Sequence, residues 1–86
     1  MIVGVNRIYE HGGKEYHLQA EDLGLDDAAF EVRVFDGGTI LFKKKVPYGE
    51  VLAQNLPKLE QDDALRALME KTVHTVQAAI AKGKLG

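Results

Sequence analysis

The sequence contains no cysteine. This absence excludes disulfide bridges, thiolate metal sites and cysteine nucleophiles, and it fits a reducing compartment. Long apolar runs are also missing. Asn6 and Arg7 interrupt the apolar start of the chain before it reaches the ~7–15 residues of a signal-peptide core, and nothing approaches the ~20 apolar residues of a membrane helix. We therefore expect a cytoplasmic protein that is neither exported nor inserted into a membrane.

An excess of charge of one sign is lacking too. The 11 lysines and arginines and 13 aspartates and glutamates give a formal net charge of -2, so the whole molecule has no attraction for nucleic acid or anionic lipid. With 86 residues, 45% of them hydrophobic and 28% charged, the chain has the composition of one globular domain, which we place at residues 1–86.

Two glycine pairs predict two β-hairpins. Gly12 and Gly13 tolerate the positive φ angles of a two-residue type I′ turn, so residues 3–21 are expected to form the first hairpin. Its register pairs Tyr9 with Tyr16, Ile8 with His17 and Arg7 with Leu18. The face expected to be buried carries Val5, Tyr9, Tyr16, Leu18 and Ala20. The polar face carries Asn6, Ile8, His17, Gln19 and Glu21.

The second hairpin is predicted over residues 30–46, around Gly37 and Gly38. Its expected pairs are Phe35 with Ile40, Val34 with Leu41, Arg33 with Phe42, and Glu31 with Lys44. In this register Phe30, Val32, Val34 and Leu41 line one face. A second apolar cluster, formed by Phe35, Ile40 and Phe42, lies on the opposite face.

Pro47 ends the last strand, and residues 49–55 are expected to hold a helical turn or two before Pro57. A long helix is predicted over residues 63–82, with Asp62 or Asp63 as its cap and Gly83 just past its end. Steps of about 100° per residue place one apolar stripe on this helix. The stripe consists of Leu65, Leu68, Met69, Thr72, Val73, Val76, Ala79 and Ile80. Arg66, Glu70, His74, Gln77 and Ala81 fall on its far side.

The predicted fold is α+β: a four-stranded, mainly antiparallel sheet built from two hairpins, with one long C-terminal helix packed on one face. The strand order stays open. One helix covers one face, so the cluster of Phe35, Ile40 and Phe42 needs another cover. Either Val51, Leu52, Leu56 and Leu59 fold back over it, or it forms a homodimer or partner-binding surface.

From this surplus apolar surface we predict a small non-enzymatic interaction module. Its expected contact residues are Phe35, Ile40 and Phe42, with His17, Gln19 and Glu21 as a polar rim. No cofactor is expected, because no nucleophile, base and orienting group can be named together. The three histidines fall on three different elements. His17 and Glu21 lie about 13 Å apart along a strand, too far to share one metal ion.

Nucleic-acid binding is the alternative function. It would use Arg33 and the run Lys43, Lys44 and Lys45, with Arg7 as a further contact. In a strand, however, Lys43 and Lys45 point one way and Lys44 the other, so the run forms no single patch. Lysines that protect an edge strand against aggregation explain the run better.

Several short motifs resemble a small uncharacterised bacterial protein family. They are the Tyr-His-x-Gln-x-Glu-Asp segment at residues 16–22, the Gly-Gly hairpin at residues 35–40, Tyr48, and the sequence Leu-Met-Glu at residues 68–70. The family is of unknown function, so the resemblance implies no activity. If residues 16–24 have a role beyond structure, it implies a recognition surface on the first hairpin's polar face and the acidic loop that follows. The family pattern places a Gln-His pair earlier than Val73 and His74 stand here, so no role is carried over to His74.

Overall fold

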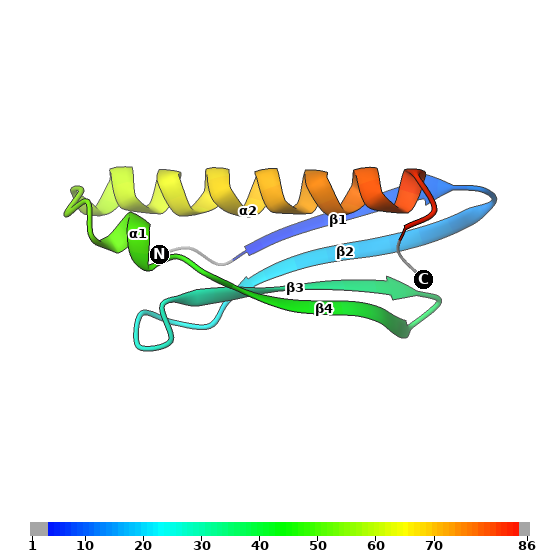
Figure 1. Cartoon of the computed structure of the whole chain (residues 1–86), viewed down its shortest axis with the longest axis horizontal. Helices are drawn as coiled ribbons and strands as arrows, with labels where there is room; N and C mark the ends of the chain where they lie inside the picture. The colour runs from blue at the N-terminus through cyan, green and yellow to red at the C-terminus, as the bar shows by residue number, and fades with distance from the viewer. Residues whose placement is uncertain (1–3, 85–86) are drawn as a thin grey trace.

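The computed structural model of the protein describes residues 4–84 (Figure 1). The expected α+β fold is confirmed: a four-stranded antiparallel sheet is followed by a long C-terminal helix. Val3, where the first hairpin was predicted to begin, lies outside the described residues. The elements are β1 (Gly4–His11), β2 (Lys14–Asp22), β3 (Ala29–Asp36), β4 (Thr39–Pro47), α1 (Gly49–Leu52) and α2 (Lys58–Ala81).

The strands are hydrogen-bonded in the order in which they occur, β1-β2-β3-β4, which makes the sheet a simple meander. Both hairpins turn on their glycine pairs as predicted, with φ angles of 60° and 79° at Gly12 and Gly13, and 56° and 86° at Gly37 and Gly38. The register of the first hairpin is also confirmed, with Tyr9 opposite Tyr16.

The second hairpin differs from the prediction because β4 contains a β-bulge. Phe35 pairs with Ile40 as expected, but Val34 pairs with Phe42, so Leu41 has no partner of its own. The predicted pairs of Val34 with Leu41, Arg33 with Phe42 and Glu31 with Lys44 are therefore wrong. The extra residue reverses the facing of β4 from Phe42 onward. Phe42 and Val46 consequently pack against the core, while Leu41 is 39% exposed.

Helix α2 lies across one face of this sheet and contacts β1, β2 and β3 (Figure 1). The predicted apolar stripe is confirmed, since all five buried residues of α2 belong to it. They meet the inward side chains of the strands in a single core. That core contains Val5, Leu18, Ala20, Phe30, Val32, Val34, Tyr48, Leu65, Met69, Val73, Val76 and Ile80.

The start of α2 was predicted wrongly. The helix begins at Lys58, directly after Pro57, and not at a cap formed by Asp62 or Asp63. A proline before the first turn costs the helix little, because the first amide groups of a helix have no internal partner. Gly83, with a φ of 69°, lies just beyond the other end as predicted.

The segment between β4 and α2 does not cover the second face of the sheet. Val51 and Leu52 of α1 pack against the core, and the loop that joins α1 to α2, residues 53–57, runs on the α2 side of the sheet (Figure 1). Leu59 is 79% exposed. Of the two covers that the sequence left open for this face, the intramolecular one is therefore wrong. Within residues 4–84, neither helix combines the length and apolar character that crossing a membrane requires.

Candidate protein-binding surface

The sheet face that points away from α2, called here the open face, carries a row of three apolar side chains and one histidine that crosses all four strands. Ile8 stands opposite His17, His17 opposite Phe35, and Phe35 opposite Ile40. Because directly opposite residues in paired strands share a face, these four side chains lie side by side. Ile8 is 60% exposed and Ile40 47% exposed, while Phe35 is half-buried. We call this set the apolar row.

The apolar row differs from the predicted cluster in that it contains Ile8 in place of Phe42 and includes His17, which was predicted in the polar rim. Phe42 was placed with Phe35 and Ile40, but the bulge at Leu41 turns Phe42 toward α2, where it packs against the core. Ile8 takes its place at the opposite end of the row. The sequence put Ile8 on the exposed side of the first hairpin. Its link to Phe35 depends on β2 pairing with β3, which the sequence did not reveal.

The predicted polar rim lies only partly beside the apolar row. His17 belongs to the row itself, and its Nε2 atom lies 3.1 Å from Oε1 of Glu15. His17, Gln19, Phe35 and Gly38 line a shallow depression on the open face. Glu21 lies farther along β2, opposite Gly4, and accepts a hydrogen bond from Arg33. Of the three rim residues, His17 and Gln19 therefore adjoin Phe35.

The charges of the open face are divided between its two halves. From the strand register, the β1–β2 half carries only acidic charges, from Glu10, Glu15 and Glu21. The β3–β4 half carries Arg33, Lys43 and Lys45 together with Glu31. One half is therefore negative and the other positive, with the apolar row running across both.

Arg33 is held by the two glutamates beside it. Its Nε donates a 2.6 Å hydrogen bond to Glu31, and its Nη1 donates a 3.0 Å hydrogen bond to Glu21. Both bonds raise the pKa of the Arg33 guanidinium above its usual value, and the bond to Glu31 has the larger effect. Its charge is already engaged, which weakens the case for phosphate binding. Arg7, the other arginine of that hypothesis, lies on the α2 side and forms a 2.6 Å ion pair with Glu70.

The lysine run is split between the two faces, as the sequence predicted. Lys43 and Lys45 pair with Arg33 and Glu31 on the open face, whereas Lys44 pairs with Val32 on the α2 side. Glu70, expected on the far side of the helix, is half-buried because it reaches Arg7.

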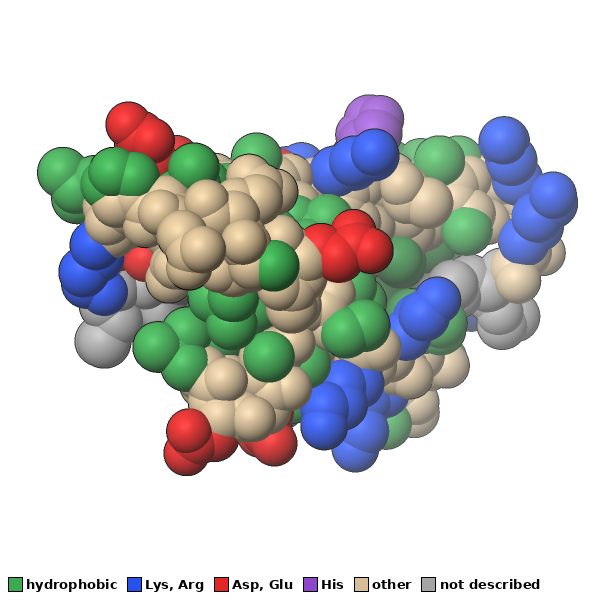
Figure 2. Space-filling view, turned by 60° about the vertical axis from the view of Figure 1, so that its left-hand side comes forward, with side chains coloured by type: hydrophobic (Ala, Val, Ile, Leu, Met, Phe, Trp, Pro, Cys, Tyr) green, Lys and Arg blue, Asp and Glu red, His purple; other side chains and the backbone are tan. Residues whose placement is uncertain are grey.

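A groove on the α2 side opens between β4, α1 and the first half of α2. It has a volume of about 870 Å³ and is lined largely by apolar groups, among them Val46, Val51 and Leu68. Lys71 and Glu50 also line it. Figure 2, which brings this end of the molecule forward, shows hydrophobic side chains gathered between the helix and the sheet, with acidic and basic side chains around them.

Tyr48 forms one wall of this groove and is itself 1% exposed. Its hydroxyl donates a 2.6 Å hydrogen bond to Oδ1 of Asp22 and lies 3.1 Å from the carbonyl oxygen of Gly24. Burial, and then the bond to Asp22, raises the pKa of Tyr48 well above its usual value. Tyr48 is thus a structural anchor between the end of β4 and the loop after β2.

His11, His17 and His74 lie on β1, β2 and α2, respectively. In the part of the chain that the structure describes, no three histidine, cysteine, aspartate or glutamate side chains are grouped so that they could hold a metal ion. Compared with models of protein families, with curated proteins and with solved structures, the chain gives no match. The resemblance to a small bacterial family accordingly stays a prediction.

Proposed function

We propose that this protein is a non-enzymatic interaction module that forms a homodimer through the open face of its sheet. The observation that carries the proposal is the apolar row. Ile8 and Ile40 are among the most exposed large hydrophobic side chains of the described residues, and they are aligned on one face with Phe35. Burial of such side chains contributes about 1.5–3 kcal/mol each, so a partner that covers the row gains stability.

The division of charge favours a second copy as that partner. In a two-fold dimer whose axis runs parallel to the strands, β1 of one copy lies over β4 of the other. The negative half of each open face then meets the positive half of the other, and the apolar rows lie on each other. An axis across the strands would instead place β1 over β1 and set like charges together. Opposed charges therefore select the first arrangement.

The size of the open face implies a reversible dimer. At ~4.8 Å between strands and ~3.3 Å per residue, four strands of about eight residues span ~500 Å². Specific interfaces bury about 800 Å² on each partner, so this one lies at the lower end of the range. We expect the dimer to dissociate on dilution. A chain without cysteine suits the reducing cytoplasm, which we propose as the location of the protein.

Sedimentation velocity across a concentration series tests the proposal. We expect the wild type to shift from monomer to dimer, and the variants Ile8→Glu and Ile40→Glu to stay monomeric. Leu59→Glu is the matched control, because Leu59 is 79% exposed but lies on α2. A wild-type protein that is monomeric at ~1 mM would overturn the homodimer. So would Ile8→Glu and Ile40→Glu variants that dimerise as strongly as Leu59→Glu.

A charge exchange tests the orientation of the axis. In the proposed dimer, Lys45 of one copy faces the Gly4 position of the other, one strand away from Glu21 of that copy. We expect Lys45→Glu to weaken the dimer and the double variant Glu21→Lys/Lys45→Glu to recover it. If the double variant is weaker than Lys45→Glu alone, the proposed axis is wrong.

A further inference from the structure

A second surface, separate from the open face, lies at the edge of β4. β4 is the last strand of the meander, so no strand within residues 4–84 pairs with its outer edge. All of its residues except Phe42 and Val46 are exposed. Such an edge presents free backbone amide and carbonyl groups, which can accept another extended chain.

The groove beside this edge would receive the side chains of an added strand. Val46 and Pro47 form its β4 side, and Ala64, Ala67 and Leu68 form its α2 side. The two alanines leave room where larger helix residues would close the gap. Neighbouring strands present directly opposite residues to the same face, so every second residue of an added strand would point toward α2 and the groove.

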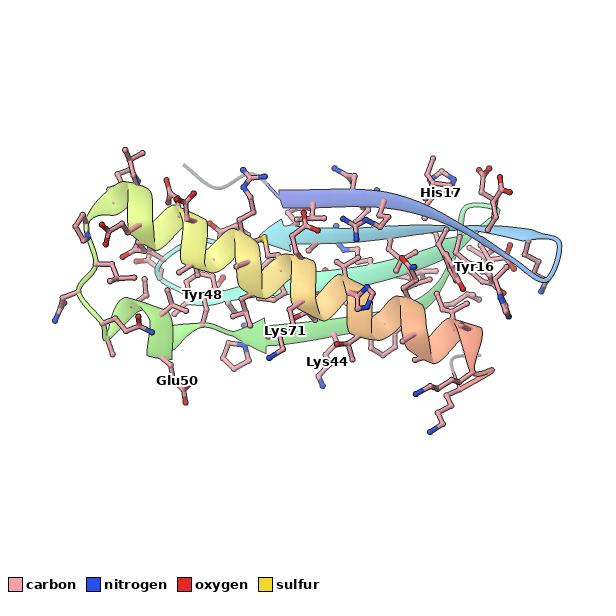
Figure 3. The ribbon with its side chains drawn as sticks, turned by 90° about the horizontal axis from the view of Figure 1, so that it is seen from above. Tyr16, His17, Lys44, Tyr48, Glu50 and Lys71 are labelled. Atoms are coloured by element: carbon pink, nitrogen blue, oxygen red, sulfur yellow. The ribbon has the colours of Figure 1, made fainter. Side chains whose placement is uncertain are left out.

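Two lysines set the charge of the expected partner. Lys71 lines the groove, and Lys44 lies between Phe42 and Val46 on the same side of β4. Figure 3 shows both lysine side chains extending over the β4 edge. Glu50 lies toward the α1 end of the groove, so acidic partner residues belong near the lysines and an apolar residue belongs near Val46.

We propose that β4 accepts an extended acidic segment of another protein as a fifth strand, with apolar side chains entering the groove between β4 and α2. The segment places apolar residues opposite Val46 and Phe42 and an acidic residue opposite Lys44. A second copy of this chain fits poorly at this edge. Two β4 strands paired about a two-fold axis would bring their lysine runs together, and like charges on paired strands are destabilising.

A labelled peptide provides the test. Its core, Val-Glu-Glu-Glu-Val between single glycines, matches residues 42–46 of β4 when read in either direction. The control peptide, Val-Val-Glu-Glu-Glu, has the same composition and charge but places its two valines on opposite faces. In fluorescence anisotropy we expect the first peptide to bind saturably and about tenfold more tightly than the control. Equal binding of the two peptides, or no saturable binding of the first, would overturn the proposal.

Backbone methylation checks that the peptide adds as a strand. Only alternate amide groups of an added strand face β4. Methylating one alternate set of peptide nitrogens should abolish binding, whereas methylating the other set should leave it nearly unchanged. If neither set matters, the peptide does not bind as a fifth strand and the proposal fails.

Protein variants locate the site. We expect Lys44→Glu and Lys71→Glu each to weaken the peptide about three- to tenfold, and the exposed Lys82→Glu, beyond the end of α2, to leave binding unchanged. Ala67→Trp, at an exposed helix position, should block the groove. Ile8→Glu should bind the peptide like the wild type, because it alters only the open face. Equal effects of Lys44→Glu, Lys71→Glu and Lys82→Glu would place the peptide elsewhere and refute the assignment.

Discussion

The hydroxyl of Tyr48 provides a sharp test of how the end of β4 is held in place. Tyr48→Phe removes one oxygen from a side chain that is 1% exposed and leaves its ring in the core. The hydroxyl bonds to Oδ1 of Asp22 at 2.6 Å, and the same carboxylate oxygen accepts the amide of Gly24 at 3.0 Å. The substitution therefore removes the side-chain hydrogen bond from Tyr48 to Asp22 and keeps the 2.7 Å backbone bond from the Tyr48 amide to the Ala28 carbonyl.

The expected cost follows from these contacts. The Tyr48 hydroxyl has one proton and can donate one full hydrogen bond, so we assign that bond to the shorter contact, with Asp22, and estimate the energetic cost from it alone. A hydrogen bond to a charged group contributes about 1.5–3 kcal/mol. Asp22 is half-buried and keeps its bond to Gly24, so we place the loss at about 1.5–2 kcal/mol. For a domain of this size, that lowers the melting temperature by roughly 6–16 °C.

The raised pKa of Tyr48 adds a dependence on pH with a definite sign. The tyrosine ionises near pH ~10 in the unfolded chain, whereas burial and the bond to Asp22 keep it protonated in the folded protein. Its contribution to stability is therefore complete below pH ~10 and is lost above it by about 1.4 kcal/mol per pH unit. Phenylalanine has no proton to lose. The stability gap between wild type and Tyr48→Phe should be constant from pH ~7 to ~9 and shrink above ~10.

Urea unfolding followed by circular dichroism measures both effects. Wild type and Tyr48→Phe should show equal dependence of the unfolding free energy on urea, since the same surface becomes exposed. A difference below about 0.5 kcal/mol at neutral pH would refute the role of the hydrogen bond. A difference that stays constant above pH ~10 would refute the raised pKa.

Two further substitutions and one double-mutant cycle test other contacts of the fold. Met69→Ala leaves a cavity at a position that is 0% exposed and should lower the free energy of unfolding by about 2–5 kcal/mol. A loss under ~1 kcal/mol in chemical denaturation would contradict the placement of Met69 in the core. Gly4→Ala would place a Cβ atom against the Ala20 carbonyl oxygen at a φ of 142°, so thermal unfolding should show a loss of about 2 kcal/mol or more. An unchanged melting temperature would show that the Gly4 backbone does not approach the Ala20 carbonyl this closely. Arg7 and Glu70 form an ion pair whose side chains are 37% and 43% exposed, so a double-mutant cycle should give a coupling energy of only about 0.5 kcal/mol that falls with added salt. A salt-independent coupling energy above ~1.5 kcal/mol would contradict an ion pair that is open to solvent.

The elements of this fold follow from local signals. Each Gly-Gly pair sits where only glycine readily adopts two successive positive φ angles, and this fixed both hairpins and the full register of the first. The apolar stripe from Leu65 to Ile80 fixed the buried side of α2. The predicted start of that helix at Asp62 or Asp63 is wrong because a proline is compatible with the position before the first turn, and the helix extends back to Lys58, directly after Pro57.

The candidate surface was less accessible from the sequence. Strict alternation put Phe42 beside Phe35 and Ile40, and nothing in the residue pattern marked Leu41 as the extra residue. The bulge stabilises the fold because it lets Phe42 and Val46 join the core under α2, at the cost of leaving Leu41 39% exposed. That gain depends on α2, a segment distant in the sequence, so an alternation pattern within β4 could not report it.

The sequence by itself determined the two hairpins, the buried stripe of the helix and the opposite facing of Lys44 and its two neighbours. These properties depend on backbone geometry over a few residues, and nearest-neighbour rules are sufficient for them. Only the tertiary structure decided that β2 lies beside β3, that Ile8 completes the apolar row, that Arg7 meets Glu70, and that a groove remains between β4 and α2. Each of these is a contact between segments far apart in the chain, selected by how one helix and four strands can bury the most apolar surface together.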